Sequence, residues 1–227
     1  MLFDLRSRGR RTTVRAVYLG LAILIGGGLI LFGVGTGIGG GGLLNAFNGG
    51  GGNQQQVVSN AERKAEKAVK TDPSNPAAWA SLVQARWTAA TTDGTGFNVS
   101  TGTFTDHGKS ELKQLTQAWE RYLALAKSPN ALTAILAARA YGSLNDYGGA
   151  ARAWEAVTTA VSNNTTAYEC LAVTAYAAGQ TRKGDLAAAK VLGLLPKSQR
   201  TPIKTSFAAA KASKSRAQQI VIQNCER

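Results

Sequence analysis

The stretch "TDPSNPAAW", residues 71–79, marks the end of one helix and the start of another. Pro73 cannot continue a helix, because its ring removes a backbone donor and clashes with the preceding turn. Ser74 or Asn75 can cap the helix that follows, and Pro76 suits the first helical position. The stretch therefore predicts two helices joined by a tight turn.

Similar junctions recur along residues 59–199 and just beyond. The remaining prolines, Pro129, Pro196 and Pro202, lie at predicted helix boundaries, and none falls inside a predicted helix. Between junctions, small or apolar residues recur at spacings of three and four, as in Ala61, Ala65 and Ala68. That spacing is typical of amphipathic helices, so this region is predicted to consist of helices folded in pairs.

Two of these pairs are related by a shift of 34 residues, from Ala131 to Thr165. Aromatic and small residues recur after both starts: Ala138, Tyr141, Tyr147, Ala150 and Trp154 in one, and Tyr168, Leu171, Ala172 and Ala175 in the other, which also closes with Pro196. The pattern resembles the tetratricopeptide repeat family. A first pair begins at Pro76 with Trp79 and Leu82. The chain departs from the pattern of that family at Val83, Ser162 and Gly184.

The resemblance implies an all-α fold, a tetratricopeptide-like α-solenoid of about three helix pairs over residues 59–199. Each pair is too small to bury its own apolar face, so neighbours stack into a continuous core. Residues 200–227 are predicted to form a basic C-terminal helix that caps the stack. Residues 91–110 are an insertion in the first pair, expected as a short hairpin around "STG" or as a loop over one end of the groove.

The family resemblance also implies a concave groove, lined by the first helix of each pair, that binds extended or helical peptide segments. Carried over position by position, the predicted groove residues are Gln84, Trp87, Leu132, Ile135, Arg139, Glu169, Val173 and Tyr176. An exposed aromatic side chain is expected at either end. For Ile135 and Val173, packing between helices is an equally good interpretation.

The N-terminal region predicts a membrane anchor. Residues 1–15 contain five arginines, and residues 16–36 are apolar or small and carry no charge. Such a run is long enough to cross a bilayer, and the positive-inside rule places its N-terminus in the cytoplasm. The alternative is a cleavable secretory signal, but the apolar run is long for one and no A-x-A site follows it.

Residues 37–58, rich in Gly, Asn and Gln, are predicted to be a flexible linker. The part of the chain beyond it would then face outward from the cytoplasmic membrane. In that oxidising location Cys170 and Cys225 can form a disulfide. A single straight terminal helix would hold the two cysteines far apart, so a bond requires the last turns to fold back. That question stays open at this point.

The sequence gives no sign of catalysis. His107 is the single histidine and has no neighbouring cysteine or carboxylate cluster beyond Asp106. No serine or threonine has an evident base, and no phosphate-binding loop or metal-ligand spacing occurs. We therefore expect no enzymatic activity, no cofactor and no metal site.

The leading hypothesis is a membrane-tethered protein-binding module, a scaffold or chaperone for envelope or exported proteins. The alternative is a structural envelope protein that binds anionic polymer or lipid through its basic C-terminal helix. From Arg182 onward, the chain contains ten Lys or Arg residues but only two acidic residues, Asp185 and Glu226. Nucleic acid is not favoured as a partner, because no aromatic residues are interleaved for base stacking.

Overall fold

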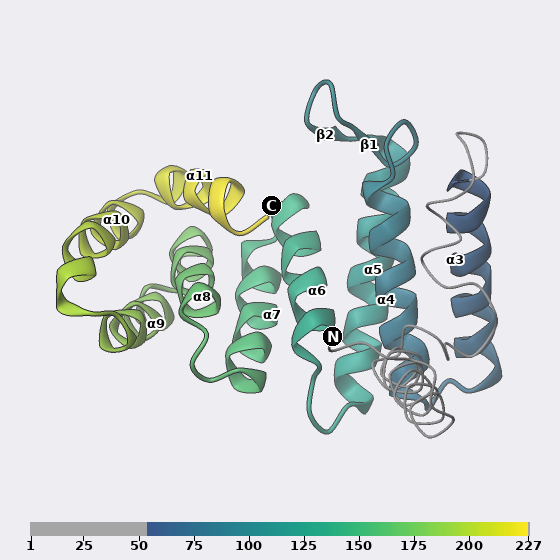
Figure 1. Ribbon diagram of the computed structural model, residues 1–227, viewed down its shortest axis with the longest axis horizontal. Coiled ribbons are helices and arrows are strands. Elements are labelled where there is room, and N and C mark those ends of the chain that lie inside the picture. The colour runs from purple at the N-terminus through teal and green to yellow at the C-terminus, as the bar shows by residue number, and fades with distance from the viewer. Residues whose placement is uncertain (1–53, 227) are drawn as a thin grey trace, which may run out of the picture. The chain divides into compact units, whose positions relative to one another are not determined.

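A computed structural model describes residues 54–226 of the chain (Figure 1). The chain divides into two units, residues 1–57 and residues 58–227. Almost all described residues belong to the second unit. The predicted basic tail, the predicted membrane span and most of the predicted linker lie outside the described residues.

The described residues are mainly helical, which confirms the predicted all-α class. The elements in chain order are α3 (Gln54–Thr71), α4 (Pro76–Thr91), β1 (Phe97–Asn98), β2 (Thr103–Phe104), α5 (Asp106–Leu125), α6 (Ala131–Ser143), α7 (Tyr147–Ala160), α8 (Thr165–Ala177), α9 (Thr181–Leu194), the 3-10 turn η1 (Lys197–Gln199), α10 (Arg200–Ala212) and α11 (Lys214–Asn224). Helix α3 begins inside the region predicted to be a linker. Within residues 54–226, no helix has the length and apolarity needed to span a bilayer.

Consecutive helices pack as pairs, α4 with α5, α6 with α7, and α8 with α9. The pairs follow one another in chain order, because α5 packs on α6 and α7 packs on α8 (Figure 1). Helix α6 begins at Ala131 and α8 at Thr165, 34 residues later. The shift deduced from the sequence is thus present in the helix boundaries.

The junction at residues 71–79 has the predicted construction. The Asn75 side chain accepts a hydrogen bond from the Ala77 backbone N–H at 2.9 Å, and Pro76 is the first residue of α4. The Trp79 indole then reaches back and donates to the Pro73 carbonyl at 2.8 Å. The cap satisfies an otherwise unpaired N–H at the helix start, and the indole bond ties the turn to the first turn of α4.

The insertion between α4 and α5 forms the hairpin that was one of its two predicted conformations. Strands β1 and β2 are antiparallel and pair Phe97 with Phe104, whose ring centroids lie 5.0 Å apart. Thr105 follows directly and caps α5 by accepting from the Gly108 N–H at 3.0 Å. Gly108 must be glycine here, since a Cβ would overlap the carbonyl of Gly96.

The C-terminal region differs from the prediction of one capping helix. The backbone of Ser213 is extended, at φ −145° and ψ 119°, and it separates α10 from α11. The Ser213 hydroxyl caps α11 by accepting from the Arg216 N–H at 3.3 Å. Because of this break, α11 turns back over α8 and reaches α6 (Figure 1).

Candidate binding surface

The predicted groove residues of α4 and α6 lie partly at the surface. Gln84 is exposed, and Trp87 and Ile135 are half-buried and pack against the core. Leu132 is 54% exposed, unusually open for a large apolar side chain. Helices α4 and α6 pack against each other, so the structure brings these residues onto two neighbouring helices.

Arg139 adds an unsatisfied charge to this surface. Its side chain is half-buried, its Nε is shielded from solvent without a hydrogen-bond partner, and no carboxylate among the described residues pairs with it. Burial lowers the pKa of Arg139 from its usual value. An unpaired guanidinium in such a position favours an incoming acceptor, above all a carboxylate.

The α8 part of the predicted groove is covered by the C-terminal helices. Val173 is 3% exposed and Glu169 is half-buried, and both line a cavity of about 70 Å³ together with side chains of α10 and α11. Val173 therefore serves helix packing, the second of its two predicted roles. Burial raises the pKa of the Glu169 carboxyl.

Tyr176 is not the exposed aromatic residue that we expected at the end of the groove. It is 5% exposed, and its hydroxyl donates to Asp185 Oδ1 at 2.9 Å. Its ring lies so close to α9 that a Cβ at Gly184 would overlap it. The residue thus faces its partner helix within the pair, and this contact explains the glycine at position 184, where the resemblance to tetratricopeptide repeats had predicted an alanine.

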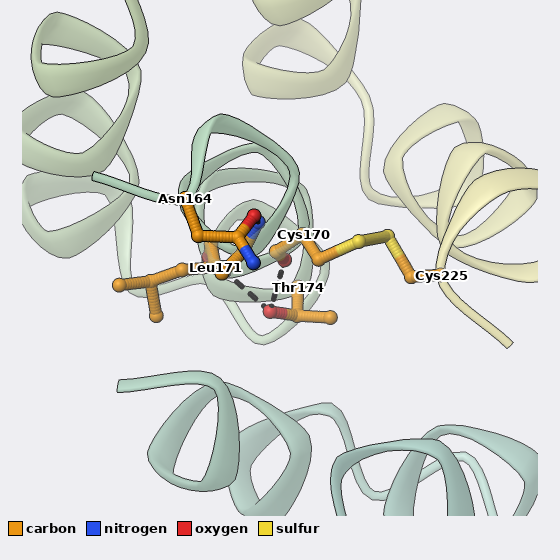
Figure 2. The surroundings of a disulfide bond; sticks show 6 residues. Asn164, Cys170, Leu171, Thr174 and Cys225 are labelled. Atoms are coloured by element: carbon orange, nitrogen blue, oxygen red, sulfur yellow. Dashed lines mark hydrogen bonds between the residues drawn. A yellow bond between two sulfur atoms is a disulfide. The ribbon is translucent and has the colours of Figure 1, made fainter. Parts of the chain in front are cut away.

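A disulfide joins Cys170 of α8 to Cys225, directly after α11, with the Cα atoms 5.7 Å apart (Figure 2). The open question about the cysteines is answered by the break at Ser213, which lets the last turns fold back. Around the bond, Asn164 caps α8, and the Thr174 hydroxyl donates to the Cys170 carbonyl at 2.6 Å (Figure 2). The disulfide therefore connects the end of α11 to the N-terminal half of α8.

A charged cluster that the sequence analysis did not single out lies at the other end of the described residues. Arg86 of α4 pairs with Glu62 and Glu66 of α3, and with Glu111 of α5 at 2.7 Å. Burial lowers the pKa of Arg86, but the three carboxylates, Glu111 foremost, outweigh this effect and leave it raised. In the sequence, the only indication of this cluster was the pair of glutamates on α3, Glu62 and Glu66, which are four residues apart.

Beside this cluster, an open pocket of about 490 Å³ lies between α4 and α5. Its lining is mixed, with apolar, amide and charged side chains: Trp79, Leu82, Arg86, Gln114, Gln117, Ala118, Glu120 and Arg121. The Glu120 carboxylate already has two partners. Its Oε1 accepts a hydrogen bond from the Tyr141 hydroxyl and lies 3.6 Å from Arg152 Nη2. The pocket offers general polar contacts and no nucleophile paired with a base.

His107 lies in the first turn of α5 and not in the insertion loop. Its imidazole is largely exposed, and Nδ1 is 3.9 Å from Glu111 Oε1. Over residues 54–226, no group of three histidine, cysteine or acidic side chains is arranged to hold a metal ion.

No family model matches the chain, and no curated protein or solved structure does either.

Proposed function

We propose that the chain is a membrane-tethered protein-binding module of the tetratricopeptide kind. The apolar segment 16–36 anchors it in the cytoplasmic membrane, and its helical pairs stand on the outer face. There it acts as a scaffold or chaperone that holds segments of envelope or exported proteins. The expectation that it is not an enzyme belongs to the same proposal.

The observation that carries this proposal is the surface of α4 and α6, defined by Gln84, Trp87, Leu132, Ile135 and Arg139. It combines an open leucine, two half-buried apolar side chains and an arginine without an acidic partner. Apolar anchors next to one unpaired charge are what a peptide segment with an apolar face and an acidic group needs.

The proposal of a tetratricopeptide-like solenoid is supported by the pairing of consecutive helices and by the 34-residue shift between α6 and α8. In such stacks each pair contacts only its neighbours, which leaves a continuous face for ligands. The insertion and the break at Ser213 are features of this chain and not of the repeat.

The alternative function, binding of an anionic polymer or lipid, is favoured by one specific observation. Between Arg182 and Arg216 the chain contains a single acidic residue, Asp185. Lys190, Lys197 and Lys204 are exposed on α9, η1 and α10. A surface of this charge attracts polyanions in a salt-dependent way.

Site-specific photo-crosslinking in intact membranes tests the proposed function. A photoreactive residue replaces Leu132 in one variant and Leu186 of α9 in the other. Leu186 is a matched control, because it is 67% exposed and lies outside the α4–α6 surface. We expect discrete protein adducts from position 132 and at least tenfold weaker adducts from position 186.

The Arg139→Gln substitution, introduced into the position-132 variant, should reduce those adducts, since it removes the unpaired charge and keeps a hydrogen-bonding side chain. Equal labelling from both photoreactive positions, or no adduct from position 132, would argue against a protein-binding surface on α4 and α6.

A further inference from the structure

Helix α11 lies on α8 as a ligand helix would. The buried side chains are Ala217, Ile220 and Val221 of α11 and Cys225 directly after it, and they follow the spacing of one helical face. The opposite side carries exposed residues such as Gln219 and Gln223. The segment therefore has one buried apolar stripe, which packs against the preceding helices, whereas Ile222 outside that stripe is 51% exposed.

The face of α8 under this segment includes positions that the family resemblance assigns to the groove. Glu169 and Val173 line the cavity of about 70 Å³ with Ile220 and Cys225. Glu226, just after the disulfide, continues toward α6, where its carboxyl lies against Gly142. The C-terminal segment thus occupies the α8 part of the predicted groove and ends beside the open α6 part.

We propose that the α8 face covered by α11 is a binding surface for an amphipathic helix, occupied here by the chain's own segment and vacated when the Cys170–Cys225 disulfide is reduced. The inference rests on the proposed function and deepens it by naming the ligand class and its control. The ligand is a short helix with small or branched apolar residues at i, i+3, i+4 and i+8, the pattern of α11.

The chemistry of the covered face supports this ligand class. Val173 and Cys170 supply an apolar floor, and neither helix α10 nor α11 contributes a charged side chain to the cavity lining. Glu169 of α8 also lines the cavity, and no described residue forms an ion pair or hydrogen bond with its carboxylate. A ligand helix with a basic or amide side chain next to its apolar stripe would satisfy that group.

The disulfide controls occupancy because it fixes the end of α11 to α8 by a covalent bond. Reduction by a dithiol breaks the S–S bond with two electrons and two protons, leaves two thiols, and converts the dithiol to its own disulfide. Cys170 is 2% exposed and Cys225 3% exposed. A reductant therefore reaches the sulfurs only after the end of α11 has opened.

Once the bond is reduced, α11 is held only by its short apolar face and competes with helices from other proteins. The disulfide closes a loop of 55 residues, and in the chain-entropy model that closure restricts the unfolded chain. Loss of that restriction weakens the C-terminal region and leaves the charge cluster around Arg86 untouched.

The test uses the full chain in uncharged detergent and a fluorescent peptide of residues 213–226 that carries Cys225→Ser. The receiving protein carries Cys225→Ser and Val221→Asp, which remove the disulfide and place a charge in the apolar face of α11. The α8 face itself is unchanged. We expect the peptide to bind this variant at least tenfold more tightly than it binds the oxidised wild-type chain.

Amide exchange of the wild-type chain gives a second measurement that needs no substitution. Reduction should accelerate exchange in α11 at least tenfold and leave α4 and α5 unchanged, which also verifies that the fold persists. Equal peptide binding to both proteins, no binding to either, or unchanged exchange in α11 overturns the proposal. Failure of the proposed function would appear as missing adducts from position 132 on α6. It can therefore be told apart from failure of the proposal about α8 and α11.

Discussion

Two glycines set how closely the helices of a pair approach each other. A Cβ at Gly149 would overlap the ring of Tyr141, and a Cβ at Gly184 would overlap the ring of Tyr176. Both tyrosine hydroxyls are used as well, since Tyr141 donates to Glu120 and Tyr176 to Asp185. Each ring fills the space that its glycine leaves on the next helix.

The substitution Gly184→Ala should destabilise the protein, although alanine is the better helix former. Overlap with the Tyr176 ring costs about 1–3 kcal/mol, more than the gain of about 1 kcal/mol in helix propensity. Urea unfolding followed by tryptophan fluorescence measures the difference.

Gly193→Ala in the same helix is the matched control, because nothing lies within 4 Å of a Cβ at that position. It should leave stability unchanged or raise it by up to about 1 kcal/mol. If Gly184→Ala behaves like Gly193→Ala, the close approach of Tyr176 does not exist in solution.

Glu226 gives the end of α11 a pH dependence. Burial without a partner for Oε1 raises the pKa of its carboxyl from 4.5 to about 7. Between pH 4.5 and about 7, the Glu226 carboxyl is therefore protonated when the segment is docked and ionised when it is not. Docking of this segment should weaken as pH rises from about 4.5 to about 7 and then level off.

An NMR titration of the Glu226 carboxyl carbon measures this directly, with an expected midpoint near pH 7. Glu226→Gln should abolish the dependence of docking on pH in this range, because glutamine does not titrate. A midpoint near the ordinary glutamate value would mean that the side chain is solvated and not held against Gly142.

Residue types alone indicated the caps but not which side chains are buried. Asparagine before a helix is a local signal, and Asn75 and Asn164 both cap the helices that follow them. Burial of Tyr176 depends instead on the distance between α8 and α9, which glycine at position 184 shortens. The family pattern, which expects alanine there, placed that tyrosine in the groove.

At the scale of elements, α3 is held to the helical pairs largely by charge. Ala65 and Val69 are its buried apolar residues, whereas Glu62 and Glu66 both reach Arg86. Burial raises the pKa of Glu62 despite the opposing effect of Arg86. The helix that leads from the N-terminal unit therefore depends on one arginine.

Arg86→Met should release α3 and cost about 3–5 kcal/mol at neutral pH, because it leaves the buried carboxylate of Glu111 uncompensated. The loss should shrink at acidic pH, because burial already raises the pKa of Glu62 and that carboxyl takes up a proton more readily once Arg86 is gone. Urea unfolding at several pH values and amide exchange of α3 measure both effects.

Arg152→Met provides the comparison, since Arg152 also faces a glutamate but both side chains are about half exposed. An exposed pair contributes only about 0–1 kcal/mol. Similar losses for the two variants would show that burial of Arg86 does not matter for α3.

Helix boundaries could be predicted wherever proline or a capping residue marks them, as at residues 71–79. The break between α10 and α11 could not be predicted from the sequence. Phe207, Ala210, Ala217 and Val221 keep a continuous helical phase across Ser213, so periodicity predicts one helix. The chain breaks there because folding back buries both halves against α8, and this is a tertiary effect.

At the scale of the described helical unit, the two ends of the stack are fastened by different chemistry. A helical stack leaves an unpartnered face at each end, which capping elements must cover. Here α3 covers one end through the cluster around Arg86, and α10 with α11 cover the other through the disulfide. The predicted groove is accordingly open on α4 and α6 and closed on α8.

Charge is also distributed unevenly over this unit, and the alternative function depends on that distribution. We expect the full chain in uncharged detergent to bind dextran sulfate through its C-terminal region. Replacing Arg182, Lys197 and Lys204, all exposed, by glutamine should remove about three anion contacts. The slope of log affinity against log salt concentration should then fall by about two to three.

Replacing the exposed Lys70, Lys113 and Lys127 by glutamine removes the same charge from the other part of the unit. If binding reflects only the net charge of +13, both triple variants should lose affinity equally. If the C-terminal face is a docking surface, only the first should change the slope, because counterions are released where the polymer makes contact. A polymer bound there would also lie over α10 and hinder the opening of α11.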